Sequence, residues 1–143
     1  MKKFYKNVLI FFFLVSFSSC EFSVTTPKVA EEVEGTYAVS QVITQETGKA
    51  AQTLAFSGKE DSPLQIRIER ASSVANANAL LILYSNDIPT ITQYISISRS
   101  ANKYSGYIFE NEVNYELQIV ESELSLMIFD DKIKLEYSAL KLE

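Results

Sequence analysis

Residues 113–121 read VNYELQIVE, and from Val113 to Ile119 apolar and polar side chains alternate without exception. Val113, Tyr115, Leu117 and Ile119 fall on one face of an extended chain, because successive side chains of a β-strand point to opposite sides. The residues between them are Asn, Glu and Gln. This alternation is typical of an antiparallel strand with one buried and one solvated face.

The same pattern occurs twice more in the chain. LQIRIER, 64–70, places Leu64, Ile66 and Ile68 on one face, and KIKLEYSA, 132–139, does the same with Ile133, Leu135 and Tyr137. Less regular strands are expected at 36–44, 51–57, 79–85, 90–98, 103–110 and 123–129. The segment 71–84 could begin with a short helix or lid, but its end favours a strand. Short connections rich in turn residues separate these segments, which indicates hairpins.

The sequence therefore predicts an all-β domain, an antiparallel meander of eight to nine strands. Such a meander can close into a small up-and-down barrel, or it can fold into a two-layer β-sandwich. We favour the barrel, because closure removes exposed strand edges and because sandwiches usually need longer Greek-key returns. The sandwich remains the alternative.

The N-terminus has the pattern of an export signal. Lys2, Lys3 and Lys6 precede an apolar run that reaches from Val8 to Phe17. This run is about half of the 20 or so apolar residues that a membrane-spanning helix needs, so we expect a cleaved signal peptide.

The signal ends in Phe17, Ser18, Ser19 and Cys20, and this cysteine is the only one in the chain. The four residues resemble the end of a bacterial lipoprotein signal, in which two small residues precede the modified cysteine. The resemblance implies cleavage between Ser19 and Cys20, and acyl chains that attach Cys20 to the membrane. An ordinary secretory cleavage after small residues is the alternative, but it would leave an unpaired thiol in an oxidising compartment.

Three segments follow from this interpretation: a signal peptide at 1–19, a lipidated N-terminus and tether at 20–34, and a β domain at 35–143. Residues 21–34, EFSVTTPKVAEEVE, have no apolar periodicity that we recognise, although Glu31 to Glu34 could form one helical turn. We expect the mature protein to be exported and to lie in the bacterial cell envelope, with the outer membrane as the expected site of the anchor.

The β domain begins with Gly35, Thr36 and Tyr37. This start resembles that of lipocalin-like domains, in which a glycine opens the first strand and a nearby aromatic residue plugs the floor of the barrel. The resemblance implies a small lipocalin-like envelope lipoprotein that binds a small lipophilic ligand. A structural lipoprotein with a filled core, which contacts another envelope protein, is the alternative.

The amino-acid composition excludes several classes of function. The chain has no histidine, and acylation of Cys20 would remove its one thiol, so the usual catalytic bases, nucleophile pairs and zinc sites are missing. We expect neither an enzyme nor a cofactor or metal site. Without the signal peptide, 10 lysines and arginines face 18 acidic residues, a net charge of −8 that disfavours nucleic acid as a partner.

Tyrosines are the remaining candidates for a site. Tyr37, Tyr115 and Tyr137 lie on the predicted inward faces, where each hydroxyl needs a hydrogen-bond partner. They could line a pocket for an amphipathic ligand or belong to a filled core. The bulky inward positions favour the filled core by a narrow margin.

Overall fold

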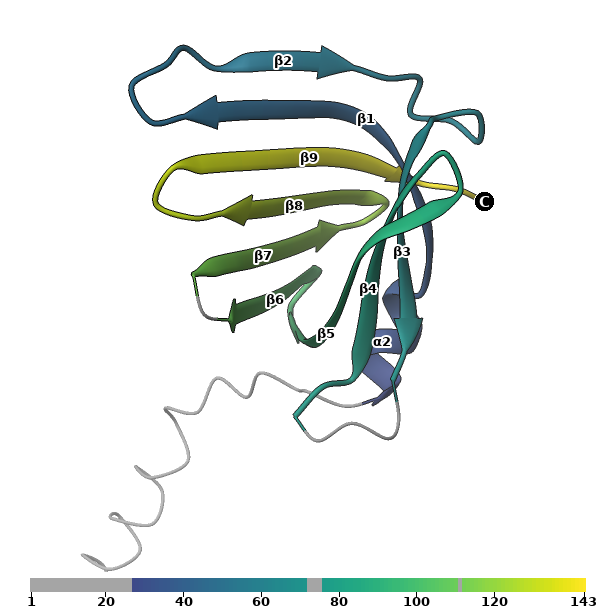
Figure 1. Cartoon of the computed structure of the whole chain (residues 1–143). Coiled ribbons are helices and arrows are strands. Elements are labelled where there is room, and N and C mark those ends of the chain that lie inside the picture. The colour runs from purple at the N-terminus through teal and green to yellow at the C-terminus, as the bar shows by residue number, and fades with distance from the viewer. Residues whose placement is uncertain (1–26, 72–75, 111) are drawn as a thin grey trace, which may run out of the picture.

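A computed structural model describes residues 27–71, 76–110 and 112–143 and is mostly β (Figure 1). From β3 to β9 the strands follow one another in the sheet in chain order, and β1 pairs with both β3 and β9, which closes a barrel of eight strands. Every neighbouring pair is antiparallel. The prediction of an up-and-down barrel is therefore confirmed, and the sandwich is not formed. The described strands are β1 (Gly35–Glu46), β2 (Gln52–Ala55), β3 (Leu64–Arg70), β4 (Ala79–Ser85), β5 (Ile88–Ser100), β6 (Lys103–Glu110), β7 (Val113–Val120), β8 (Glu123–Phe129) and β9 (Ile133–Lys141).

Strand β1 has different partners along its length. One edge pairs with β9, while the other edge pairs first with β3, through residues 35–38, and then with β2, through residues 41–44. A bulge between Val39 and Gln41 separates the two parts, as bulges commonly do where a strand bends. Strand β2 is thus an addition to the eight-stranded barrel, and all four of its residues are exposed.

The inward side chains are those that the alternation predicts. Ile66 and Ile68 of β3 and Leu117 of β7 have no exposed surface, and Ile119 has 1%. Leu117 faces Leu126 across the β7–β8 pair, where both side chains are fully buried. Large aliphatic side chains therefore fill this part of the barrel, as is usual for an eight-stranded barrel.

One glycine provides necessary space in this core. Gly106 of β6 lies opposite Leu117, and a Cβ atom at Gly106 would approach Ile95 Cδ1 to 2.7 Å. Because Ile95 is itself buried, its side chain has little room to move aside. The glycine makes room for this isoleucine.

The end of the predicted tether folds onto the barrel, which corrects the prediction for residues 27–33. These residues form the helix α2 (Pro27–Val33), and Val29, Ala30 and Val33 of this helix are buried. Positions i, i+1 and i+4 lie on one face of a helix, so this short apolar face can cover an end of the barrel core. In Figure 1, α2 lies beside the end of β3, away from the turns β1–β2, β6–β7 and β8–β9. We call the end that α2 covers the closed end, and the opposite end the open end.

Candidate functional site

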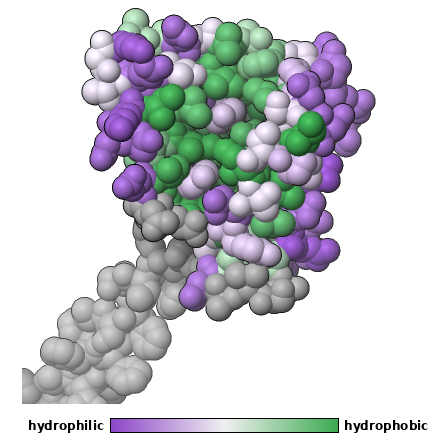
Figure 2. Space-filling model, in the orientation of Figure 1, coloured by the Kyte–Doolittle hydropathy of each residue, from purple (hydrophilic) through white to green (hydrophobic). Residues whose placement is uncertain are grey.

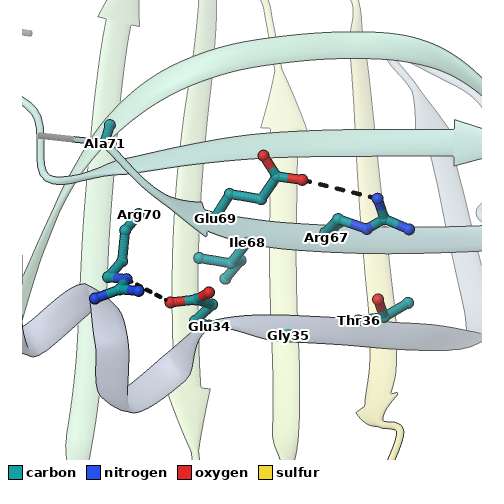
Figure 3. Close-up of a pocket in the computed structure, with 8 residues that line it drawn as sticks. All are labelled: Glu34, Gly35, Thr36, Arg67, Ile68, Glu69, Arg70 and Ala71. Atoms are coloured by element: carbon teal, nitrogen blue, oxygen red, sulfur yellow. Dashed lines mark ion pairs between the residues drawn. The ribbon is translucent and has the colours of Figure 1, made fainter. Parts of the chain in front are cut away.

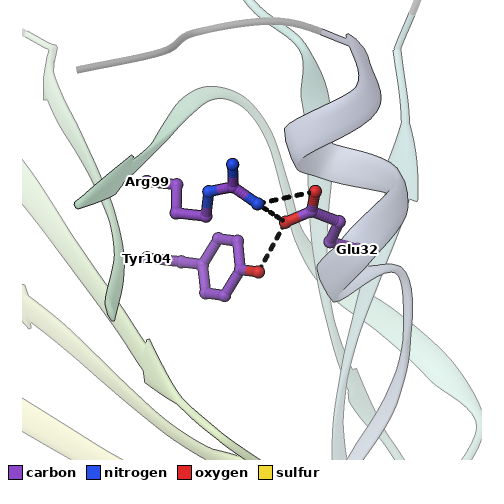
Figure 4. Close-up of polar contacts among 3 residues, drawn as sticks. All are labelled: Glu32, Arg99 and Tyr104. Carbon is purple, nitrogen blue, oxygen red and sulfur yellow. Dashed lines mark hydrogen bonds and ion pairs between the residues drawn. The ribbon is translucent and has the colours of Figure 1, made fainter. Parts of the chain in front are cut away.

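The closed end is fixed by a polar cluster on α2. Glu32 accepts two hydrogen bonds from Arg99 Nη1, at 2.9 and 2.8 Å, and one from the Tyr104 hydroxyl at 2.5 Å (Figure 4). The hydrogen bond from Tyr104 lowers the pKa of Glu32, and the contact with Arg99 lowers it further. Because Arg99 and Tyr104 flank the turn between β5 and β6, the cluster ties the helix to this hairpin.

A second set of ion pairs holds the other side of α2. Arg70 Nε lies 2.8 Å from Glu34, and Arg70 Nη1 lies 3.7 Å from Glu31. An open hollow of about 600 Å³ lies at this place, lined by Glu34, Gly35, Thr36, Arg67, Ile68, Glu69, Arg70 and Ala71 (Figure 3). All four of its charged residues are paired, since Arg67 also contacts Glu69 at 3.7 Å. The hollow therefore presents no unpaired charge to a ligand.

Tyr37 belongs to the closed end and lines no open space. Its side chain has no exposed surface, and its hydroxyl donates a 2.7 Å hydrogen bond to the carbonyl oxygen of Val33 at the end of α2. Burial, together with the nearby Tyr104, raises the pKa of Tyr37 to about 12. Tyr37 thus supports the helix and belongs to the core, which is the alternative that the sequence favoured for the inward tyrosines.

The core becomes less buried toward the open end. Side chains near α2 are 0–2% exposed, whereas Val42, Leu83, Ile108 and Ile128 are 4–7% exposed. Leu64, Ile91, Val113 and Leu135 are only partly buried and pack against the same core. Figure 2 shows hydrophobic residues gathered in the middle of the face that Figure 1 presents, with hydrophilic residues around them. We call the four residues that are 4–7% exposed and the four that are partly buried, together with Tyr115 and Tyr137, the apolar mouth.

The two remaining tyrosines are the polar groups of this mouth. Tyr115 and Tyr137 are each 8% exposed, and neither hydroxyl has a hydrogen-bond partner among the described residues. No fully buried side-chain oxygen or nitrogen in this part of the chain lacks a partner, so both hydroxyls must reach solvent. Burial raises the pKa of the Tyr137 hydroxyl above its ordinary value of 10.

Strand β8 separates the two tyrosines. Tyr115 pairs with Ile128 on one side of β8, and Tyr137 pairs with Leu126 on the other. Two strand spacings of 4.7–4.9 Å place their backbones roughly 10 Å apart, with aliphatic side chains between. This arrangement can bind an apolar group between the rings and hydrogen-bond a polar atom at either edge.

Sequence reasoning missed one inward polar residue. Gln93 lies between Ile91 and Ile95 on the inward face of β5, pairs with Leu81 and is half-buried. The sequence could have indicated this inward orientation of Gln93, because Ile91, Gln93 and Ile95 occupy alternate positions and therefore share one face of a strand.

The predicted signal peptide, Ser19 and Cys20 lie outside the described residues. Within the part of the chain that the structure describes, no helix has the length and hydrophobicity to cross a membrane.

Comparisons of the chain with protein-family models, with curated proteins and with solved structures gave no match. The candidate site therefore rests on the geometry of the apolar mouth.

Proposed function

We propose that this chain is a lipid-anchored lipoprotein of the bacterial envelope whose barrel binds a small lipophilic ligand in its apolar mouth. The observation that carries the proposal is the pair Tyr115 and Tyr137. Each is about nine-tenths buried among apolar side chains, and neither hydroxyl has a hydrogen-bond partner among the described residues. Both hydroxyls reach solvent at the edge of the mouth, so a bound ligand that displaces this solvent would find two hydrogen-bonding groups beside an apolar surface.

The filled core limits the size of this ligand. Leu117, Leu126 and Ile66 leave no exposed surface beneath the mouth, so a ligand would lie in the open half of the barrel. We therefore expect a small molecule or one short chain, in keeping with the interior of an eight-stranded barrel.

The proposed anchor fixes the direction in which the mouth faces. Six residues lie between Cys20 and Pro27, the first residue of α2, and the seven steps from Cys20 to Pro27 span at most about 25 Å in an extended chain. The closed end would thus lie near the bilayer, and the mouth would face away from it. Two or three acyl chains on Cys20 would hold the protein stably at the membrane, because one chain alone binds only marginally.

Two measurements test the proposal separately. The intact mass of the protein from its native membrane should correspond to a chain that begins at Cys20 and carries acyl groups. A mass without acyl groups would contradict the anchor.

For the ligand, thermal unfolding should be measured across a panel of small lipophilic compounds. A compound at 100 times its Kd stabilises the fold by about 2.7 kcal/mol. Unchanged melting with every compound would contradict the binding function. Tyr115→Phe and Tyr137→Phe should weaken a compound that hydrogen-bonds there, while Tyr94→Phe, at a tyrosine that is 52% exposed, serves as the matched control.

An interaction lipoprotein is the second candidate function, and β2 is the observation that favours it. Leu54 is 60% exposed, no charged residue occurs at 50–58, and the outer edge of β2 pairs with no described strand. Such an edge can accept a strand from another protein. Crosslinking in intact envelopes should then give a reproducible partner that Leu54→Lys abolishes and Val120→Lys, on another exposed surface, retains.

A further inference from the structure

We propose that the apolar mouth selects amphiphiles with a cationic head group over amphiphiles with an anionic one. This inference rests on the proposed ligand-binding function and deepens it. Tyr115 and Tyr137 indicate where a ligand would bind, but their hydroxyls do not discriminate by charge. A phenolic hydroxyl can donate to a carboxylate and can equally accept from an ammonium group.

Charged residues at the open end supply the discrimination. Because the strands form a meander, the turns β1–β2, β4–β5, β6–β7 and β8–β9 all lie at this end. Contacts between Thr47 and the backbone of Asp131 and Lys132 place two of these turns side by side. Among the described residues of these turns, the charges outside the ion pairs are Asp87, Glu112, Asp130 and Asp131, against Lys132.

Two pairs of opposite charge beside these turns cancel. Glu46 contacts Lys49, and Glu136 lies 3.6 Å from Lys134. Asp130 stays ionised, because it accepts hydrogen bonds from the backbone N–H groups of Ile133 and Lys132, which lower its pKa. We call these four turns the rim; their described residues carry a net charge of about −3, from the four carboxylates of Asp87, Glu112, Asp130 and Asp131 against Lys132.

The size of the effect follows from Coulomb's law. Each rim charge about 10 Å from a head group contributes about 0.1–0.4 kcal/mol, depending on screening by salt, and the sign reverses between a cation and an anion. Three such charges favour the cation by about three- to fiftyfold, and physiological salt brings the preference toward the lower value.

Three ligands with the same tail test this inference. Binding of dodecylamine, 1-dodecanol and dodecanoate should be measured by calorimetry below micelle-forming concentrations, at low and high salt. The protein should be the full chain with Cys20→Ser, which leaves no thiol to acylate. We expect the amine to bind best, the alcohol to be intermediate, the acid to bind worst, and the differences to shrink in high salt.

A matched pair of variants locates the charges. Neutralising the rim with D87N, E112Q and D131N should remove most of the preference and leave the alcohol unaffected; Asp130 is kept because it stabilises its turn. The control neutralises three exposed acids of the closed end with E121Q, E123Q and E143Q, and it should keep the preference.

The possible failures are distinguishable. Dodecanoate binding as tightly as dodecylamine, or a preference that survives neutralisation of the rim, would overturn the charge selectivity and leave the proposed ligand site standing. Absence of binding by all three compounds would overturn the site and the selectivity together.

Discussion

The same substitution at three tyrosines should give different losses of stability. Tyr37→Phe removes a 2.7 Å hydrogen bond and leaves the carbonyl oxygen of Val33, at the end of α2, without this partner. A buried carbonyl that loses its partner costs about 1–3 kcal/mol. Tyr115→Phe and Tyr137→Phe remove hydroxyls that bond to no described residue, so each should change the free energy of unfolding by less than about 0.5 kcal/mol.

Urea unfolding of the ligand-free protein measures these differences directly. For a domain of this size 1 kcal/mol corresponds to about 4 °C in Tm, so Tyr37→Phe should also lower Tm by about 4–12 °C. Equal losses at all three positions would refute the reasoning, because the loss of stability would then not depend on the hydrogen bond that Tyr37 alone makes. A neutral Tyr37→Phe would refute the role of this hydroxyl in holding α2.

Alkaline pH adds an independent check on Tyr37. Burial raises its pKa to about 12, above the ordinary value of 10 for an unfolded chain. The folded protein therefore favours the protonated form, and the stabilisation that this provides is complete below pH 10 and is lost as the pH rises toward 12. Tyr37→Phe should lose less stability than the wild type over this interval. A parallel decline of the two proteins would contradict the assignment.

Three further predictions concern the ion pairs and the core. Tyr104 and Arg99 lower the pKa of Glu32, so the stability that its charge provides is present above pH 4.5 and is lost on acidification; the Tm difference between wild type and Glu32→Gln should be largest near neutral pH and vanish in acid. Gly106→Val should destabilise the protein by about 1–3 kcal/mol in urea unfolding, because the new methyl groups would overlap Ile95; a stabilised variant would show that the core has spare room there. Leu126→Ala should cost about 2–5 kcal/mol, whereas Leu54→Ala, on the exposed strand β2, should cost less than about 0.5 kcal/mol; similar losses would contradict the burial described above.

Most of the barrel could be predicted from the sequence because its strands have one wet face. At Leu64, Ile66 and Ile68, alternation identifies the strand and its inward side together, and the same holds for 113–119. Closure was predictable as well, since short connections allow neighbouring strands to pair in chain order.

Helix α2 was missed because its signal is short and mixed. Val29, Ala30 and Val33 have the spacing of a helical face, but seven residues give only one repeat of that spacing. The glutamates of this segment resemble those of a solvated tether, and only the fold brings arginines to them. The partner of Glu32, Arg99, lies 67 residues away, a separation over which no local pattern extends.

The candidate site was only partly predictable for a related reason. Alternation places Tyr37, Tyr115 and Tyr137 on inward faces, and all three do face inward. It cannot tell which end of the barrel a residue occupies, because that depends on the register of neighbouring strands and on the helix that covers one end. The difference between Tyr37 and the other two tyrosines therefore required the structure.

Pairing of β1 with β9 has a consequence for how the protein reaches this fold. Tyr37 pairs with Lys141, so barrel closure joins residues about 100 positions apart, whereas the most distant partners in any other strand pair, Gly35 and Ile68, are 33 positions apart. Bringing such distant segments together has a large entropic cost, which makes closure the expected slow step of folding. During synthesis the strands from β1 to β8 can pair early, but the edge of β1 that faces β9 must wait for the last strand. A newly made chain would therefore pass through an open sheet whose edges are β1 and β8, and this intermediate is the one most exposed to aggregation.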